Sequence, residues 1–397
     1  MAQKAPSVIV TFKERGITAI QRSQRGILAM ILTETKPLDP LTIYSVDDIP
    51  ESGLSADNVE QIQLALKGYQ TSPRKILVYT VKDTTYTDIL KTLENVRFDW
   101  LVIPGISAEC GNSCSWIKSM RTVKDKAVKA VLPNEAADFE GVVNFTNTSL
   151  QTKSKTYTAA QYCSRVAGII CGTPMTISCT YAPAPELIAC DSYTSDERDE
   201  KVGKGELFFF NDGEKIKICK GVNSYVTTVQ GKLNSYQKIK LVDLMDMIHD
   251  DIKQTGHDSY IGKYANSYDN RCLLVTAING YFHELEKEGL LEVGQNLAEI
   301  DIEATKNWLE ANGKYTRDEL ESMTDLPSRR QTLARMCSSN PLFPCWTPSN
   351  TLKSATSSNK EGYRCTKLIL SESSMALMGS SGWMAMKLPK SSPVRPL

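Results

Sequence analysis

The chain has 397 residues, of which 41% are hydrophobic and 23% charged, and its formal net charge is zero. This length allows two or three domains, and the composition is that of a soluble globular protein. No run of eighteen apolar residues occurs, and the start lacks a basic region followed by an apolar one. We therefore expect neither a membrane span nor a signal peptide, and we expect folding in a cytosol.

The first 22 residues contain one β-prone run and nothing with which it could pair. That run is Val8, Ile9, Val10, Thr11 and Phe12. A strand needs a neighbouring strand to satisfy its backbone N–H and C=O groups. Residues 1–22 are therefore predicted to be an extended arm whose strand pairs elsewhere, in this chain or in another.

Two α/β units are predicted to follow, over residues 23–97 and 98–230. Buried strands are predicted by apolar runs, helices by apolar stripes at helical spacing, and a hairpin by two β-prone runs around Asp212-Gly213. The predicted strands are 26–32, 75–81, 100–105, 129–132 and 141–145, the helices 55–66, 87–95, 114–121, 159–170 and 195–204, and the hairpin 206–219.

Residues 231–325 change to a helical pattern, and we predict a separate C-terminal domain there. Leu241, Leu244, Met245 and Ile248 recur at helical spacing. A second helix carries Ile278, Phe282 and Leu285 on one face, and a third is predicted over residues 301–309. The whole pattern predicts a mixed α/β (α+β) multi-domain protein with mixed sheets flanked by helices.

Residues 326–397 differ in charge and composition from everything before them. Residues 327–397 carry ten Lys or Arg against two Asp or Glu, a net charge of +8, and contain 14 Ser and 7 Pro. The remainder of the chain has a net charge of −8. Taken alone, this stretch has the composition of a disordered basic tail.

No arrangement of residues with a recognisable catalytic or metal-binding pattern occurs. His249, beside two acids on a helical face, is interpreted as a solvated histidine. Cys110 and Cys114 could supply two zinc ligands, but no second close pair follows. The eleven cysteines are expected to be free thiols buried as small hydrophobes. We therefore predict no catalytic, cofactor-binding or metal-ligating residues.

A long chain with an unpaired strand and no recognisable site favours assembly over catalysis. A strand lent to a neighbour's sheet in a head-to-tail manner produces a ring or an open helical array. The alternative is a cytosolic α/β enzyme with a site beyond the strand that ends at Gly105, using Glu109 and Lys118. Outside the tail no basic stripe with interleaved aromatics occurs, so we expect no direct contact with nucleic acid.

Several segments resemble, in order along the chain, the tail sheath proteins of contractile phages, particularly those of Gram-positive prophages and tail-like bacteriocins. The resemblance covers about residues 1–325. The segments are Ala5-Pro-Ser-Val-Ile-Val-Thr-Phe12 with Arg25-Gly-Ile-Leu-Ala29, Phe98-Asp-Trp-Leu-Val-Ile-Pro-Gly105, Lys204-Gly-Glu-Leu-Phe-Phe209, Met247-Ile-His-Asp-Asp-Ile252, Tyr260-Ile-Gly-Lys263 and Ala298-Glu-Ile-Asp-Ile-Glu-Ala304.

The resemblance implies a structural role and no enzymatic activity. Subunits would stack as hexameric rings around an inner tail tube, with Val8 to Phe12 completing a sheet in a neighbouring subunit. Contraction would drive the tube through the target envelope. Tail tube, baseplate and tail terminator proteins are the implied partners, with assembly in the bacterial host cytoplasm, no cofactor and no insertion of this subunit into a membrane. Another tail or baseplate component is the alternative.

The tail departs from the family pattern in a way that the genetic code can explain. Family members end on a stretch like Ala-Asn-Thr-Gly-Ser-x-Val-Phe, and later Leu-Asp-Ala-x-Glu. In the neighbouring reading frame Cys337 must read valine, Trp346 leucine and Thr347 aspartate, while residues 331–335 permit Ala-Asn-Thr-Gly-Ser. We interpret residues from about 326 as an out-of-frame translation that replaces the native last strand. A genuine, divergent basic tail is the alternative.

Overall fold

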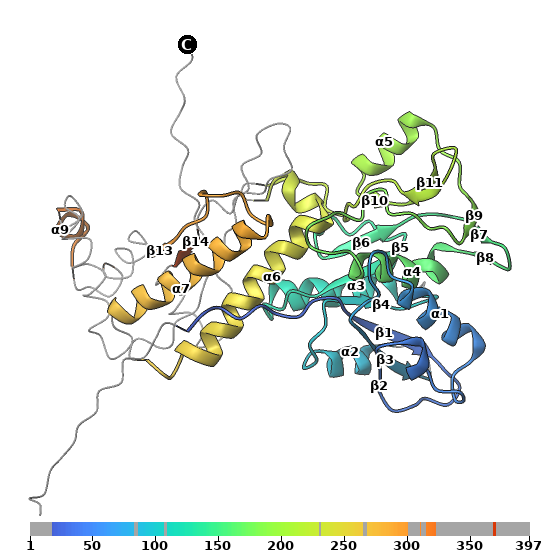
Figure 1. Cartoon of the computed structure of the whole chain (residues 1–397), viewed down its shortest axis with the longest axis horizontal. Coiled ribbons are helices and arrows are strands. Elements are labelled where there is room, and N and C mark those ends of the chain that lie inside the picture. Colours follow the sequence, from blue (N-terminus) through green and yellow to red (C-terminus); the bar gives the residue numbers. More distant parts are fainter. Residues whose placement is uncertain are drawn as a thin grey trace, which may run out of the picture.

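The computed structural model of the protein describes residues 18–82, 86–106, 109–229, 232–264, 268–300, 310, 315–322 and 368–370. Elements from the first 230 residues build an α/β body, and two long helices, α6 and α7, extend to one side of it (Figure 1). The predicted mixture of helices and sheets is confirmed.

Seven strands form the central sheet of the body, in the order β10-β6-β5-β4-β1-β3-β2. All neighbouring pairs are parallel except β2 with β3. Helices cover both faces of a parallel sheet, which is why its strands read as continuous apolar runs. The strands are β1 (Ile27–Thr33), β2 (Leu41–Ile43), β3 (Lys75–Val81), β4 (Trp100–Val102), β5 (Lys129–Pro133), β6 (Val142–Phe145) and β10 (Glu206–Leu207).

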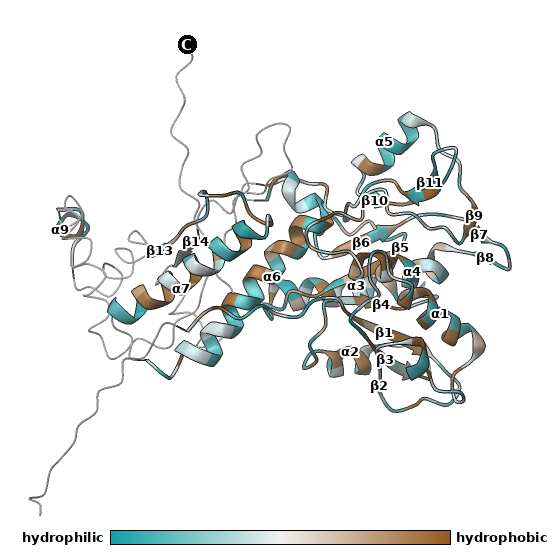
Figure 2. Cartoon of the chain, in the orientation of Figure 1, coloured by the Kyte–Doolittle hydropathy of each residue, from teal (hydrophilic) through white to brown (hydrophobic). Residues whose placement is uncertain are grey.

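Alternate residues of β1 pack into two different apolar layers. Leu28 and Met30 pack with helices α1 (Ala56–Leu66) and α4 (Ala159–Cys171), while Ile27 and Ile31 pack with α2 (Thr87–Leu93) and α3 (Cys110–Thr122). Successive residues of β1 are accordingly hydrophobic, and the strand is drawn mostly brown in Figure 2. The sheet is thus the middle of three layers.

The boundary predicted at residue 97 runs through this sheet. β1 pairs with β3 from the first predicted unit and with β4 from the second. The β-α alternation in the sequence is the same on both sides of residue 97, and it does not say which strands become neighbours.

The hairpin predicted over residues 206–219 forms only in part. β11 (Phe209–Asn211) pairs antiparallel with β12 (Ile216–Ile218), but Glu206–Leu207 leaves the hairpin as β10 and pairs with β6 of the central sheet. Beside the hairpin lie a three-stranded sheet, of β7 (Leu150–Thr152), β8 (Thr156–Tyr157) and β9 (Leu187–Cys190), and the helix α5 (Ser195–Gly203).

The C-terminal part is built on α6 (Ile239–Thr255) and α7 (Tyr268–Lys287), with a π-helical turn at Gly256–Tyr260. The predicted stripes meet here: Leu244 and Ile248 pack with Ile278, Phe282 and Leu285. β13 (Ala298–Ile300) pairs parallel with β14 (Leu368–Leu370) from the tail, and α9 spans Arg317–Ser322. Short 3-10 turns lie at Val46–Asp48 and Asn234–Gln237. The helix predicted over residues 301–309 lies outside the described residues.

Within the described ranges, every helix is too short or too polar to cross a bilayer.

Candidate assembly site at the amino edge of the sheet

The strand predicted to link subunits, Val8, Ile9, Val10, Thr11 and Phe12, lies outside the described residues. The last part of the predicted arm is described, beginning at Thr18. It runs beside α6 before the chain enters β1 (Figure 1). The candidate site therefore consists of the described end of the arm, from residue 18 onward, and the surface of α6 that it contacts.

Residues 18–25, which we name the strap, are fastened to α6 and to the turn after it. Tyr260 donates its hydroxyl to the carbonyl of Thr18 at 2.9 Å. The backbone N–H of Gln21 donates to Thr255 Oγ1 at 3.1 Å, and that of Ser23 to Asp251 Oδ1 at 2.7 Å. The strap thus runs antiparallel to α6. Ile20, only 8% exposed, joins the apolar cluster between α6 and α7.

Charged side chains lie just before, or at the start of, three adjacent strands. Arg25 precedes β1, Asp99 precedes β4, and Lys129 begins β5. Because these strands are parallel neighbours, their amino ends meet at one edge of the sheet. The side chains converge there on α6, which lies against this edge.

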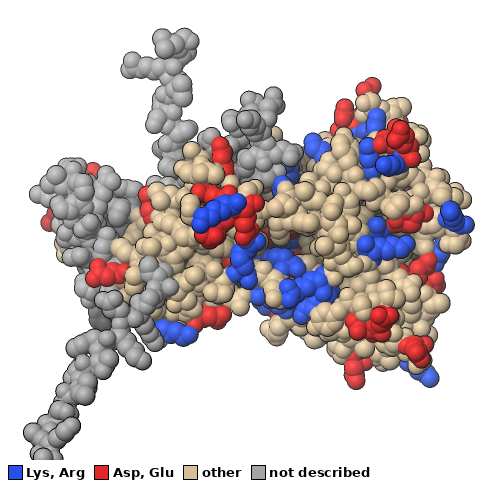
Figure 3. Space-filling model, viewed as in Figure 1, with Lys and Arg blue, Asp and Glu red and all other residues tan. Residues whose placement is uncertain are grey.

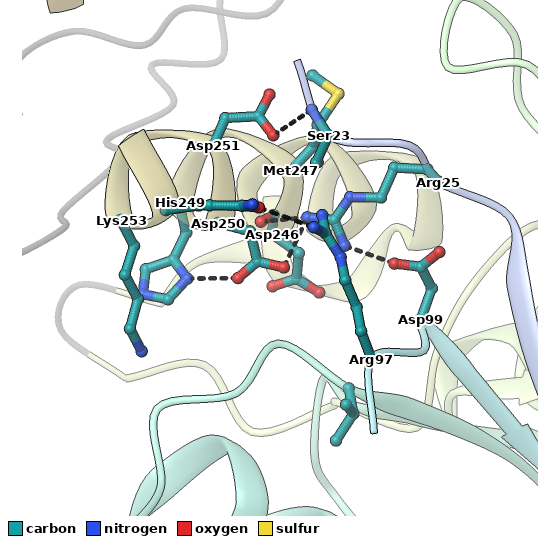
Figure 4. A network of polar contacts seen from close by, with 12 residues as sticks. Ser23, Arg25, Arg97, Asp99, Asp246, Met247, His249, Asp250, Asp251 and Lys253 are labelled. Carbon is teal, nitrogen blue, oxygen red and sulfur yellow. Dashed lines mark hydrogen bonds and ion pairs between the residues drawn. The ribbon is translucent and has the colours of Figure 1, made fainter. Parts of the chain in front are cut away.

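Arg25 joins the strap, the sheet and α6. Its guanidinium pairs with Asp99 at 2.7 Å and with Asp250 at 2.9 Å, and it donates to the carbonyl of Asp246 at 2.6 Å (Figure 4). Burial alone would lower the pKa of Arg25, but Asp99, Asp250 and Asp246 raise it above its usual value. Arg25 therefore stays charged inside the junction.

Asp246 is the centre of the contact between α6 and the sheet. It accepts two hydrogen bonds from Arg121, each at 2.9 Å, and pairs with Lys129 Nζ at 2.6 Å. Lys129 is 2% exposed, also pairs with Asp243 at 3.0 Å, and lies 5.2 Å from the centre of the Trp100 ring. Burial raises the pKa of a lone carboxyl, but Arg121 and Lys129 hold the pKa of Asp246 well below its usual range.

His249 is not the solvated residue that the sequence predicted. Its ring is 17% exposed, with Nε2 at 3.1 Å from Asp125 and Nδ1 at 3.0 Å from Asp250. Burial opposes its charge, but hydrogen bonds to these two carboxylates raise its pKa to about 9. In the sequence, Asp250 and Asp251 follow His249 directly. In the structure the two carboxylates that contact the His249 ring are Asp250 and Asp125, and Asp125 lies in the loop after α3.

The charged residues at this contact, given at the end of this paragraph, are named the ionic junction, and its cations equal its carboxylates in number. A buried charge whose partner is missing is costly, so such a network is stable only when α6 docks in one register. Lys and Arg also gather on the visible face beside this join (Figure 3). The cations are Arg25, Arg121, Lys129, His249 and Lys253, and the carboxylates are Asp99, Asp125, Asp243, Asp246 and Asp250.

The ionic junction is not among the predictions made from the sequence, although α6 carries a signal of it. Asp243, Asp246 and Asp250 recur at helical spacing, on a different face of α6 from Leu244 and Ile248. Acids on one face of a helix are usually solvated. Only the basic residues placed at the sheet edge give this face a buried partner.

The residues suggested for an enzymatic site do not converge. Lys118 Nζ donates to the carbonyl of Ala137 at 2.8 Å, and Glu109 accepts from its neighbour Asn112 at 2.7 Å. In the part of the chain that the structure describes, no group of three His, Cys, Asp or Glu side chains could hold a metal ion. Cys110 and Cys114 are buried free thiols, and burial raises the pKa of Cys110 to about 11.

Comparison with known proteins places this architecture in one family. Residues 80–224 match the model of the phage tail sheath protein central domain, and residues 232–320 match that of the phage tail sheath C-terminal domain. The tail sheath protein of Clostridium phage phiCD119 is 39% identical over 312 residues, which are 77% of this chain and 86% of that protein. The chain belongs to the phage tail sheath family, and it is a structural subunit of a contractile tail sheath.

Two solved structures share its fold. The sheath tail protein of Desulfitobacterium hafniense is 18% identical, with a TM-score of 0.61 over 72% of this chain and 91% of that one. The contracted helical sheath of the anti-feeding prophage is 13% identical, with a TM-score of 0.57 over 72% of this chain and 85% of that one.

Proposed function

We propose that this subunit forms stacked hexameric rings around an inner tail tube, and that each subunit lends Val8 to Phe12 to a sheet in a neighbour. The observation that carries the proposal is the strap. It directs the chain away from the sheet and along α6, so that at Thr18, where the described part of the arm begins, the chain lies against the turn after α6 and not beside its own sheet. A strand presented in this way fits the addition of a strand to a second copy.

The acceptor in the neighbour is β13, which lies before residue 326. Among the described residues β13 pairs only with β14, which belongs to the ending proposed to be out of frame, so the other edge of β13 pairs with no described strand. Such an edge offers backbone N–H and C=O groups to an incoming strand. Repetition of this head-to-tail contact gives rings and helical stacks, because donor and acceptor are different surfaces of one subunit.

Contraction then requires subunits that move as rigid bodies while their strand linkages hold. The ionic junction supports this role because it fixes α6 to the sheet in one register. The proposed partners are the tail tube, baseplate and tail terminator proteins. The subunit is assembled in the host cytoplasm and is located in the virion tail or tail-like particle. It has no catalytic role.

Residues from about 326 onward are proposed to be an out-of-frame translation. The match to the C-terminal sheath model stops at residue 320, just before the charge and composition change. The coding DNA decides the matter. A sheath-like ending in the neighbouring frame supports the proposal, and its absence from that frame overturns it.

The proposed arm linkage is tested by light scattering and sedimentation of the purified protein with its ending restored to the other frame. A variant lacking residues 1–15 is expected to remain folded by circular dichroism and to stay monomeric. A matched control replaces the same residues with a Gly/Ser segment of equal length, which keeps the length of the arm and removes its strand. Assembly of either variant to the same extent as the intact arm would contradict the proposal.

A further inference from the structure

The strap and α6 match each other in spacing. Gln21 and Ser23 are two residues apart, and their acceptors, Thr255 and Asp251, are four residues apart. Two residues of extended chain span about 6.6 Å, and four residues of helix rise about 6 Å. One repeat of the strap therefore corresponds to about one turn of the helix, and successive contacts stay in register.

The helix side of this contact sets the register, because the strap contributes backbone groups. Any residue other than proline offers the same N–H, so Gln21 and Ser23 are not selected by their side chains. Asp251 and Thr255, by contrast, must supply an oxygen at these positions. Two further contacts hold the strap on either side of Gln21 and Ser23. Ile20 packs in the apolar cluster between α6 and α7, and Arg25 pairs with Asp99.

Asp251 ties the strap to both helices. Its Oδ1 accepts from the backbone N–H of Ser23 at 2.7 Å, and its Oδ2 accepts from the hydroxyl of Tyr281 on α7 at 2.6 Å. It is 0% exposed. Asp251 thus joins the strap to α7 through two hydrogen bonds, whereas Thr255 accepts one hydrogen bond from Gln21.

We propose that Asp251 and Thr255 are positioning residues for the arm. They hold its root in one register on α6, so every subunit presents its arm from the same point. A pull on the arm during contraction is then resisted along α6 before it reaches β1. This inference rests on the proposed exchange of arms between subunits.

Thr255→Val is the first test, because valine keeps the shape of threonine and removes the acceptor. The matched control is Thr276→Val on the exposed face of α7, where the hydroxyl only donates to Cys272 of its own helix. Loss of one hydrogen bond is expected to speed amide exchange at Gln21 by about fivefold to tenfold. The control should leave exchange at Gln21 unchanged.

Asp251→Ala is expected to release both Gln21 and Ser23, with a larger gain in exchange than Thr255→Val. Asp251→Asn should restore most of the protection, because its amide oxygen still accepts from Ser23. Tyr281→Phe removes only the hydrogen bond on the α7 side and separates loss of the strap from general loosening of the helices. If Asp251→Ala does not fold, Thr255→Val and Asp251→Asn carry the test.

Assembly supplies the readout that a purely local role would not change. In the chain with its ending restored to the other frame, Thr255→Val and Asp251→Ala sheaths should be shorter and should break into separate rings on contraction more often than the Thr276→Val control. Intact sheaths of normal length from both variants, despite fast exchange at Gln21 and Ser23, would overturn the inference alone. Failure of the unmodified arm to assemble would instead overturn the proposed function.

Discussion

The body of this subunit and the join between the body and α6 are both buried, but they are held by different forces. In the body, residues such as Met30 and Ile31 pack on opposite faces of one sheet. At the join, Asp246 meets Arg121 and Lys129. Apolar packing stabilises without strict direction, whereas a buried ion pair is stable only with its partners in place. The comparison suggests that the body supplies stability and the ionic junction supplies a defined geometry.

Asp246→Ala should produce the largest effect, because it leaves Arg121 with no partner from α6 and Lys129 with Asp243 alone. Removing one side of a buried ion pair destabilises by about 3–5 kcal/mol. The free energy of unfolding from urea titration measures this loss. Asp39→Ala, at an exposed position, is the matched control and should change stability by no more than about 0.5 kcal/mol. Equal effects of the two substitutions would contradict the role given to the ionic junction.

Gly168→Ala tests the body by packing alone. A Cβ at Gly168 on α4 would lie 2.2 Å from the carbonyl oxygen of Ala65 on α1, so the two helices would have to separate. Overpacking of this kind costs about 1–3 kcal/mol. Gly203→Ala, on α5 and with nothing within 4 Å of its Cβ, is the control and should be neutral or slightly stabilising. Thermal unfolding followed by circular dichroism should show a lower midpoint for Gly168→Ala and an unchanged or slightly higher midpoint for Gly203→Ala.

The smallest expected effect is a dependence on pH that belongs to the ionic junction and not to the apolar body. The pKa of His249 is raised from 6.5 to about 9 by its carboxylate partners, so its contribution is complete below pH 6.5 and is lost as pH rises through 9. The side chain of Asp125 is 56% exposed, and hydrogen bonds and ion pairs with His249 and Lys253 lower its pKa from 3.8 to about 2, so its contribution is lost as pH falls below 3.8 toward 2.

His249→Gln should abolish the alkaline part of this profile. The difference in unfolding free energy between the unmodified chain and His249→Gln should be constant below pH 6, should shrink between pH 6.5 and 9, and should change no further above pH 9. His283→Gln is the control, because the His283 side chain is 63% exposed. A difference that did not change between pH 6 and pH 10 would show that His249 is not held as a cation.

The sequence predicted much of the body, for a physical reason. Strands of a parallel sheet are apolar on both faces, so the runs that became β1, β3 and β4 could be read directly. The apolar stripes of α6 and α7 were equally readable and do meet in one cluster. What could not be read was which strands are neighbours, and the boundary at residue 97 therefore divided one sheet.

The ionic junction could not be predicted because each of its charges looks solvated by itself. Asp246 lies in an ordinary amphipathic helix, and Lys129 begins an ordinary strand. Their pairing depends on α6 crossing the amino edge of the sheet, which is a contact between residues 117 positions apart in the sequence. The predicted hairpin over residues 206–219 forms only in part for the same reason, a contact between distant residues. Glu206 and Leu207 pair with β6, so only Phe209–Asn211 pairs with β12.

Negative-stain electron microscopy tests most directly whether this subunit builds a sheath through its arm. The purified protein, with residues after 325 restored to the other frame, should form wide hollow tubes, and the same chain without residues 1–15 should not. If residues from about 326 are out of frame, as proposed, the chain as it stands should form few or short tubes. Dispersed single particles from the restored chain, or long tubes from the chain without its arm, would contradict the account.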